Sequence, residues 1–149
     1  MPTNESSPAF RERLRPAVWV YLATALVIPA SLLVFLPISL AAGIAVAAGL
    51  YLAILIVLFA TTPTVAVADG ELHAGRARIP LEFVARATGF RGAEATAERG
   101  TRLDARAWLL LRGWIDPVVR IELNDPDDPT PYWLVSTRHP EELAAALQR

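Results

Sequence analysis

The chain has 149 residues, 54% of them hydrophobic, and a formal net charge of −1 at pH 7. This length allows one ordinary domain, or a membrane anchor followed by a small domain. The absence of Cys excludes disulfides, thiolate nucleophiles and thiolate-ligated metals. The near-neutral charge provides no whole-chain field that would favour binding to nucleic acid.

The N-terminal segment is polar and then basic. Its first residues contain Pro, Ser and Asn, which is typical of disorder. Arg11, Arg13 and Arg15 follow, against a single acid, Glu12. We expect residues 1–15 to form a disordered, basic N-terminus.

A long uncharged stretch follows, because residues 16–68 contain no Asp, Glu, Lys or Arg. A membrane-spanning helix needs about 20 apolar residues. The stretch predicts two transmembrane helices, over about 17–36 and 40–60. Pro29 lies inside the first and cannot donate a hydrogen bond to the carbonyl of Ala25, so a kink is expected there.

Small residues recur every four positions in the second predicted helix, at Ala45, Gly49 and Ala53. Such a stripe allows another helix to approach closely. Two interpretations remain open. The stripe packs against the chain's own first helix, or it packs against a second copy of the chain or a partner helix.

Charge predicts the orientation of this membrane hairpin, residues 16–63. Arginines occur before the first helix and after the second, at Arg76 and Arg78, but the short link between the helices has none. The positive-inside rule then places both termini in the cytoplasm, with the chain crossing the membrane twice. A cleaved signal peptide is the disfavoured alternative, since a second apolar span follows at once.

Residues 64–149 read as a small α+β domain. Asp69-Gly70 marks a hairpin turn, and Ile79-Pro80 argues against a central strand at that point. We expect a loop or weak strand over 91–103. Further strands are predicted over 107–112, 118–123 and 132–136. The ending "HPEELAAALQR" predicts a helix that packs Leu143 and Leu147 on the sheet. The fold class is therefore a helical membrane hairpin followed by an antiparallel, strongly bent sheet of about six or seven strands, closed by one C-terminal helix.

Three segments resemble a known family: "GRARIPLE" (75–82), "DARAWLLLRGW" (104–114) and "DPDDPTPYWLVSTRHPEELAAAL" (125–147). They are similar to a bacterial, chiefly actinobacterial, membrane protein family catalogued as domain of unknown function thirty ninety-three. The resemblance covers nearly the whole chain and implies no particular activity. The C-terminal part also resembles bacterial pleckstrin-homology-like domains, in element order and in the pattern around Ile79-Pro80, which is a likeness of fold and not of function.

Three candidate sites have simpler structural explanations or lack the residues they would need. Residues 124–129 carry acids that could bind a cation, but an EF-hand would need Gly and a carboxylate where the sequence has Thr130 and Ser136. Asn, Asp and Pro are also usual turn residues. Ser136 with His139 could suggest a nucleophile and base, but there is no nucleophile-elbow motif. His73 has no obvious second metal ligand, so we predict no metal and no catalytic residue.

The segment "RAWLLLRGW" is the stronger candidate for a binding surface. At strand spacing Arg106, Trp108 and Arg112 share one face, and Trp114 follows in a turn. Arg stems and Trp rings can lie along an apolar boundary with their polar ends in water. This face would dock on lipid or on a partner protein. Alternatively, Trp108 belongs to the core and the arginines pair with acids across the sheet.

These observations predict a membrane-anchored module that binds a protein partner and is not an enzyme. Transport would need ionisable groups within the spans, and none is present. The alternatives are an accessory subunit acting through its helices, or a domain that binds lipid directly. No cofactor is expected. No nucleic acid is expected either, because residues 61–149 hold 11 Arg against 13 Asp and Glu, which gives no basic field for backbone binding.

Overall fold

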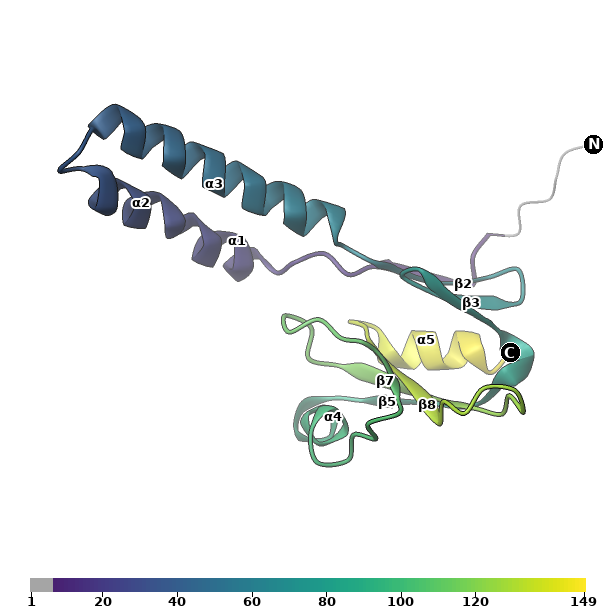
Figure 1. The fold of residues 1–149 in the computed structure, drawn as a ribbon. Helices are drawn as coiled ribbons and strands as arrows, with labels where there is room; N and C mark the ends of the chain where they lie inside the picture. The colour runs from purple at the N-terminus through teal and green to yellow at the C-terminus, as the bar shows by residue number, and fades with distance from the viewer. Residues whose placement is uncertain (1–6) are drawn as a thin grey trace, which may run out of the picture. The chain divides into compact units, whose positions relative to one another are not determined.

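The computed structural model describes residues 7–149 and divides them into two units (Figure 1). The helical unit comprises residues 15–62. The β-rich unit comprises 63–149 together with the segment before residue 15. The helices are thus an insertion within the chain of the β-rich unit and do not simply precede it.

The first long apolar helix is broken in two, as α1 (Val18–Ala25) and α2 (Val27–Phe35). The break falls at Leu26, three residues before Pro29. Proline has no N–H and its ring crowds the carbonyl four residues earlier, so the regular ladder fails there. The interruption expected from Pro29 is present, at Leu26.

The second apolar helix is α3 (Leu40–Ala60), which has the predicted bounds. It begins at Ser39, whose hydroxyl accepts a hydrogen bond from the N–H of Ala42 at 3.3 Å and caps the helix. Both helices are long enough and apolar enough to cross a membrane, and only 11% of either is buried within the structure. A core helix of a soluble protein would be mostly buried.

The two helices run side by side and contact each other through small residues of α3 (Figure 1). Gly43 and Ala47 are its buried residues. A Cβ placed on Gly43 would lie 3.3 Å from Cβ of Phe35 and 3.4 Å from Cδ2 of Leu32. Because Gly43 has no side chain, α2 can approach α3 closely at this position.

The first sheet of the β-rich unit is antiparallel, with strand order β1-β2-β3-β4. Its strands are β1 (Phe10–Arg13), β2 (Thr64–Ala68), β3 (Glu71–Ala74) and β4 (Ala77–Pro80). One inward-facing row joins Phe10, Val67, Leu72 and Ile79, all buried. Since β4 is an edge strand, it tolerates Pro80, as expected.

Strand β1 corrects the expectation of a disordered segment over residues 1–15. Residues 1–6 lie outside the described residues, but Phe10–Arg13 pairs with β2. Phe10 and Leu14 are buried, at 7% and 0% exposure, and Glu12 also faces inward. Inward-facing residues alternate with the outward-facing Arg11 and Arg13, which is a strand pattern. The high charge of the segment led instead to the prediction of disorder.

The second sheet has strand order β5-β7-β8-β6. Its strands are β5 (Val84–Phe90), β6 (Trp108–Leu110), β7 (Val118–Leu123) and β8 (Tyr132–Ser136), and a 3₁₀ turn at Leu81–Phe83 leads into β5. Strand β6 runs parallel to β8, which corrects the expectation of a purely antiparallel sheet. Among the described residues there are thus two four-stranded sheets in place of one bent sheet, and no closed barrel.

The segment expected to be a loop or weak strand contains the helix α4 (Gly92–Arg99). Asp116 accepts a hydrogen bond from the N–H of Gly92 at 2.8 Å, and Arg99 donates to Asp116 at 3.2 Å. The hydrogen bond from Gly92, followed by that from Arg99, holds the pKa of the Asp116 carboxyl below its usual value. A run of good helix formers between two glycines is the sequence feature that would have predicted this helix.

The main core lies between the two sheets and is covered by α5 (Pro140–Leu147), whose Leu143, Ala146 and Leu147 are buried. The predicted packing of this helix is confirmed. The first turn of α5 packs closely against β5: a Cβ placed on Gly89 would lie only 2.9 Å from Cβ of Pro140. Glycine at position 89 lets the helix reach this edge of the sheet.

Candidate functional site

The two tryptophans of the predicted docking face both pack against the core. Trp108 lies in β6, and its ring centroid is 4.3 Å from that of Trp133 on β8. Trp114 is half-buried, and its Nε1 has no hydrogen-bond partner among the described residues. Most of the apolar area of these rings is therefore used within the domain.

The two arginines of this segment are held locally. Arg106 pairs with Asp104 at 3.0 Å, and this hydrogen-bonded pair lowers the pKa of the Asp104 carboxyl. The Arg112 guanidinium lies 6.0 Å from the centroid of the Trp114 ring, a cation–π distance. The structure thus brings Arg112 and Trp114 together and directs Arg106 to a neighbour two residues away.

The small-residue stripe of α3 faces away from the chain's own first helix. Ala45, Gly49 and Ala53 are all exposed. A Cβ placed on Gly49 would meet no atom within 4 Å, whereas Gly43 and Ala47 make the internal contact. The interpretation in which this stripe packs within the hairpin does not match the structure.

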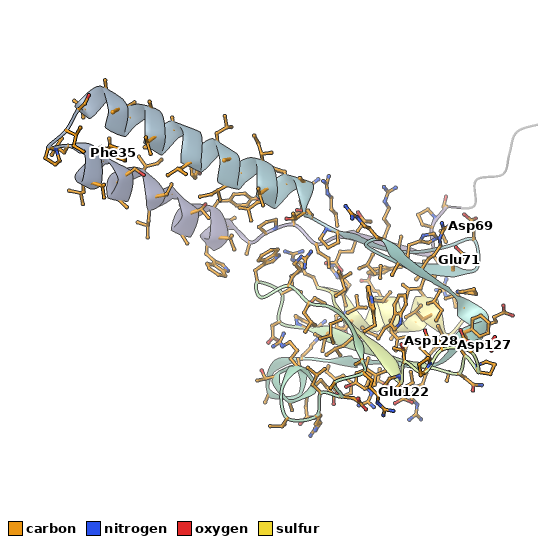
Figure 2. All side chains as sticks on the ribbon, viewed as in Figure 1. Phe35, Asp69, Glu71, Glu122, Asp127 and Asp128 are labelled. Carbon is orange, nitrogen blue, oxygen red and sulfur yellow. The ribbon has the colours of Figure 1, made fainter. Side chains whose placement is uncertain are left out.

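Asp127 and Asp128 lie in the acidic loop between β7 and β8 (Figure 2), and the carboxylates of this loop accept hydrogen bonds within the turn. Asp125 accepts from the N–H of Asp127 at 2.9 Å, and Asp128 accepts from the N–H of Thr130 at 2.9 Å. The hydrogen bonds from Thr130 lower the pKa of Asp128. Side-chain oxygens that bond two residues ahead are the ordinary chemistry of an Asx turn.

The Ser, Thr and His residues after β8 also have structural roles. Buried Ser136 accepts a hydrogen bond from the N–H of Arg112 at 3.0 Å. Thr137 accepts one from the N–H of His139 at 3.1 Å, next to the start of α5. His73 lies on β3 with its Nε2 3.5 Å from Glu71. These contacts account for each polar group without a nucleophile–base pair.

A hydrogen-bonded contact between the two ends of the β-rich unit was not predicted from the sequence. The carboxylate of Glu12, in β1, accepts hydrogen bonds from the Thr137 hydroxyl and from the N–H of Arg138 at 3.1 Å. The Arg138 guanidinium lies 3.5 Å from the same carboxylate. Glu12 thus joins the strand before the helices to the turn before α5.

A second polar cluster fixes α4 on the outer face of the second sheet. Glu98 is buried, with its carboxylate 3.3 Å from Arg120 and 3.4 Å from Arg102. The Arg120 guanidinium lies 4.0 Å from the centroid of the Tyr132 ring, and the Tyr132 hydroxyl accepts from the N–H of Asp104 at 2.8 Å. The cluster joins a helix, two strands and a loop.

Three exposed arginines lie on the outward face of the first sheet and a fourth in the turn between β3 and β4, and we call this set the basic face: Arg11, Arg13, Arg78 and, in the turn, Arg76. Arg11 and Arg78 lie in one cross-strand row, joined through Ala66 and His73. Sequence reasoning missed this surface because a hairpin of about fifty residues separates its two halves in the chain.

A family model described as "Protein of unknown function (DUF3093)" matches residues 9–147. The chain belongs to this family. The match begins at β1 and ends with α5, so the family unit includes the inserted helices as well as both sheets. No curated protein and no solved structure gives a significant match.

Proposed function

We propose that this protein is a non-enzymatic module of the bacterial cytoplasmic membrane, which anchors a binding domain through a helical hairpin inserted between two neighbouring strands. One observation carries the proposal. The N–H of Leu14 donates to the carbonyl of Pro63 at 3.0 Å, so the hairpin leaves and re-enters the domain at adjacent points.

This connection favours a double crossing of the membrane. The exposed side chains of both helices are overwhelmingly apolar, including Val18, Leu33 and Ile56 at 75%, 74% and 59% exposure. Exposure of that much apolar surface to water is unfavourable, whereas lipid would cover it. Because both ends of the hairpin start from one sheet, the domain and residues 7–14 lie on the same side, and the arginine distribution favours the cytoplasmic side.

The likeness to pleckstrin-homology-like domains is part of the proposal. Without the short parallel strand β6, the unit has four strands in one sheet and three in the other, followed by a closing helix. The structure adds one feature to that comparison, since the first strand precedes the membrane helices. A domain held at the membrane gains effective concentration there, so a weak intrinsic affinity for a protein partner suffices.

The accessory-subunit alternative is favoured by one observation, the exposure of Ala45, Gly49 and Ala53 on α3. A partner helix, or a second copy of the chain, would then bind at this stripe. Affinity purification in mild detergent separates the two functions. Gly49→Leu abolishes partner recovery if the helices bind the partner and leaves it unchanged if the domain does.

Topology is tested by single cysteines, because the natural chain has none. We expect Ile38→Cys, in the link between the helices, to react with an impermeant maleimide from outside the cell. Thr101→Cys, on an exposed loop of the domain, should react only in inverted vesicles. Labelling of both positions from the same side, or recovery of the protein in the soluble fraction, would contradict the proposed anchoring.

A further inference from the structure

We infer that the basic face of the first sheet, formed by Arg11, Arg13, Arg76 and Arg78, docks on the anionic phospholipid headgroups of the membrane in which the hairpin is inserted. The inference rests on the proposed membrane anchoring and specifies the surface that the domain turns toward the lipid. It replaces the Arg-Trp segment as the lipid-facing surface.

The first support is the register of the sheet. Arg11 is aligned with Ala66, Ala66 with His73, and His73 with Arg78, so this row starts and ends with a guanidinium. Arg13 is aligned with Thr64 in the next row toward the hairpin. The central strand β2 presents only the small side chains of Thr64, Ala66 and Ala68 on this face, which leaves the flanking guanidiniums accessible to a flat surface.

The second support is that these arginines are not engaged elsewhere. Six other arginines form ion pairs within the domain: Arg91, Arg99, Arg102, Arg106, Arg120 and Arg138. Among residues 7–149, no ion pair or hydrogen bond from the side chains of Arg11, Arg13, Arg76 or Arg78 is found. The near balance of arginines and acids in the domain therefore does not describe this face, because most arginines elsewhere are paired with acids, whereas none of these four is.

The third support is a separation of charge along the strands. Arg13 and Arg76 lie at the end of the sheet where the hairpin is attached, since the N–H of Gly75 donates to the carbonyl of Thr64 at 2.9 Å. Asp69 and Glu71 lie at the opposite end, around the turn that joins β2 to β3 (Figure 2). At a rise of about 3.3 Å per residue, the length of β2 places some 16 Å between the two ends.

The acidic β7–β8 loop also lies far from the hairpin attachment. It precedes β8, whose other end is followed by Thr137, the residue that hydrogen bonds with Glu12 beside Arg13. The cationic end of the domain is thus the one joined to the helices. An anionic leaflet would attract that end and repel the turns that carry Asp69 and Asp127.

Chain length places the basic face within reach of lipid. Only five residue steps separate Arg13 from Val18 at the start of α1, which an extended chain covers in at most about 18 Å. Thr64 follows the last residue of α3, Ala60, by four steps, at most about 14 Å. Surface potential decays over about 8 Å at physiological salt, so the field of the headgroups acts on these arginines when the face lies against the membrane, an approach that such short linkers allow.

The test uses the full chain in lipid nanodiscs, with an environment-sensitive NBD fluorophore on Ala66→Cys at the centre of the basic face. Thr88→Cys, exposed on β5 of the second sheet, is the matched control position. Reduction of the fluorophore by dithionite is timed in phosphatidylcholine discs with and without phosphatidylglycerol. We expect protection of position 66, but not of position 88, only when phosphatidylglycerol is present.

The protected fraction should also depend on charge. Replacing all four arginines of the basic face by Gln should remove the protection, because each arginine near an anionic surface changes the docking equilibrium by about fivefold. The matched variant replaces four exposed arginines elsewhere, Arg86, Arg91, Arg106 and Arg149, and should retain it. For the unmutated face, raising the salt to about 1 M shortens the screening length to about 3 Å and should abolish protection without any substitution.

Each unfavourable result has a distinct meaning. If the chain does not stay with the discs after alkaline extraction, the proposed anchoring fails, whatever the charges do. If the chain stays but position 66 is equally exposed with both lipids, the inference is wrong and the anchoring stands. Protection that persists in pure phosphatidylcholine or at high salt would also overturn it, since the contact would then not be with anionic headgroups.

Discussion

Replacing the hairpin by a turn tests whether the helices are a true insertion. In one variant, residues 15–62 are exchanged for a short Asn-Gly turn that joins Leu14 to Pro63. In a second, the chain starts at Pro63 and lacks β1. Because the N–H of Leu14 already bonds the carbonyl of Pro63 at 3.0 Å, the first variant needs no rearrangement of the sheet and should be soluble and folded.

The expected loss of stability in the second variant follows from the side chains that β1 and the residue after it bury. Phe10 and Leu14 are 7% and 0% exposed, and full burial of such side chains contributes about 1.5–3 kcal/mol each. Their loss removes about 3–6 kcal/mol, before the hydrogen bonds of Glu12 and the bare edge of β2 are counted. Since single domains are stable by about 5–15 kcal/mol, the second variant should be marginal or unfolded.

The assay is urea unfolding followed by tryptophan fluorescence, because Trp108, Trp114 and Trp133 remain after the hairpin is removed. Glu12→Ala within the hairpin-free variant is the intermediate case, and loss of its acceptor oxygens should cost about 1–3 kcal/mol. Equal stability of the two variants would refute the structural role of β1. Aggregation of the hairpin-free variant would refute the insertion itself.

Three further predictions concern single side chains. Gly89→Ala should destabilise the hairpin-free domain by about 1–3 kcal/mol in urea, because its Cβ would lie 2.9 Å from the first residue of α5. Gly43→Val should lower the thermal stability of the full chain in detergent, whereas Gly49→Val, with no atom within 4 Å of its Cβ, should not. The hydrogen bonds from Arg91 lower the pKa of Glu141 from 4.5 to about 2. The domain with Arg91 should therefore be more stable than the Arg91→Gln variant above about pH 4.5, and this difference should disappear as the pH falls through 2. Urea unfolding midpoints measured across that pH range test this.

Long, locally coded elements could be predicted from the sequence. The bounds of α3 follow from an uninterrupted apolar run, and the break at Leu26 follows from one proline. The closing helix and strand β7 carry their periodicity in their own residues, as in the inward Val119 and Ile121. Each of these signals lies within about twenty neighbouring residues, so no knowledge of the fold is required.

Elements stabilised by distant partners could not be predicted in this way. Strand β1 is short and charged, and its partner strand begins at Thr64, 51 residues after Arg13 (64 − 13). The parallel pairing of β6 depends on where the chain returns after α4, which no local pattern records. The basic face depends on the same register, because Arg11 and Arg78 become neighbours only after four strands align.

The double connection between hairpin and domain restricts motion in a way that a single tether would not. Adjacent strands are about 4.8 Å apart, whereas packed helices are about 8–10 Å apart, so the two short linkers before Val18 and after Ala60 must diverge slightly. Two covalent connections at neighbouring points prevent the free rotation that one flexible linker allows. A lower entropy cost then accompanies any docking of the domain on the membrane, because most of its orientational freedom is already lost. We therefore expect a modest set of four arginines to suffice for docking under this condition, whereas the same four on a freely diffusing domain would bind lipid only weakly.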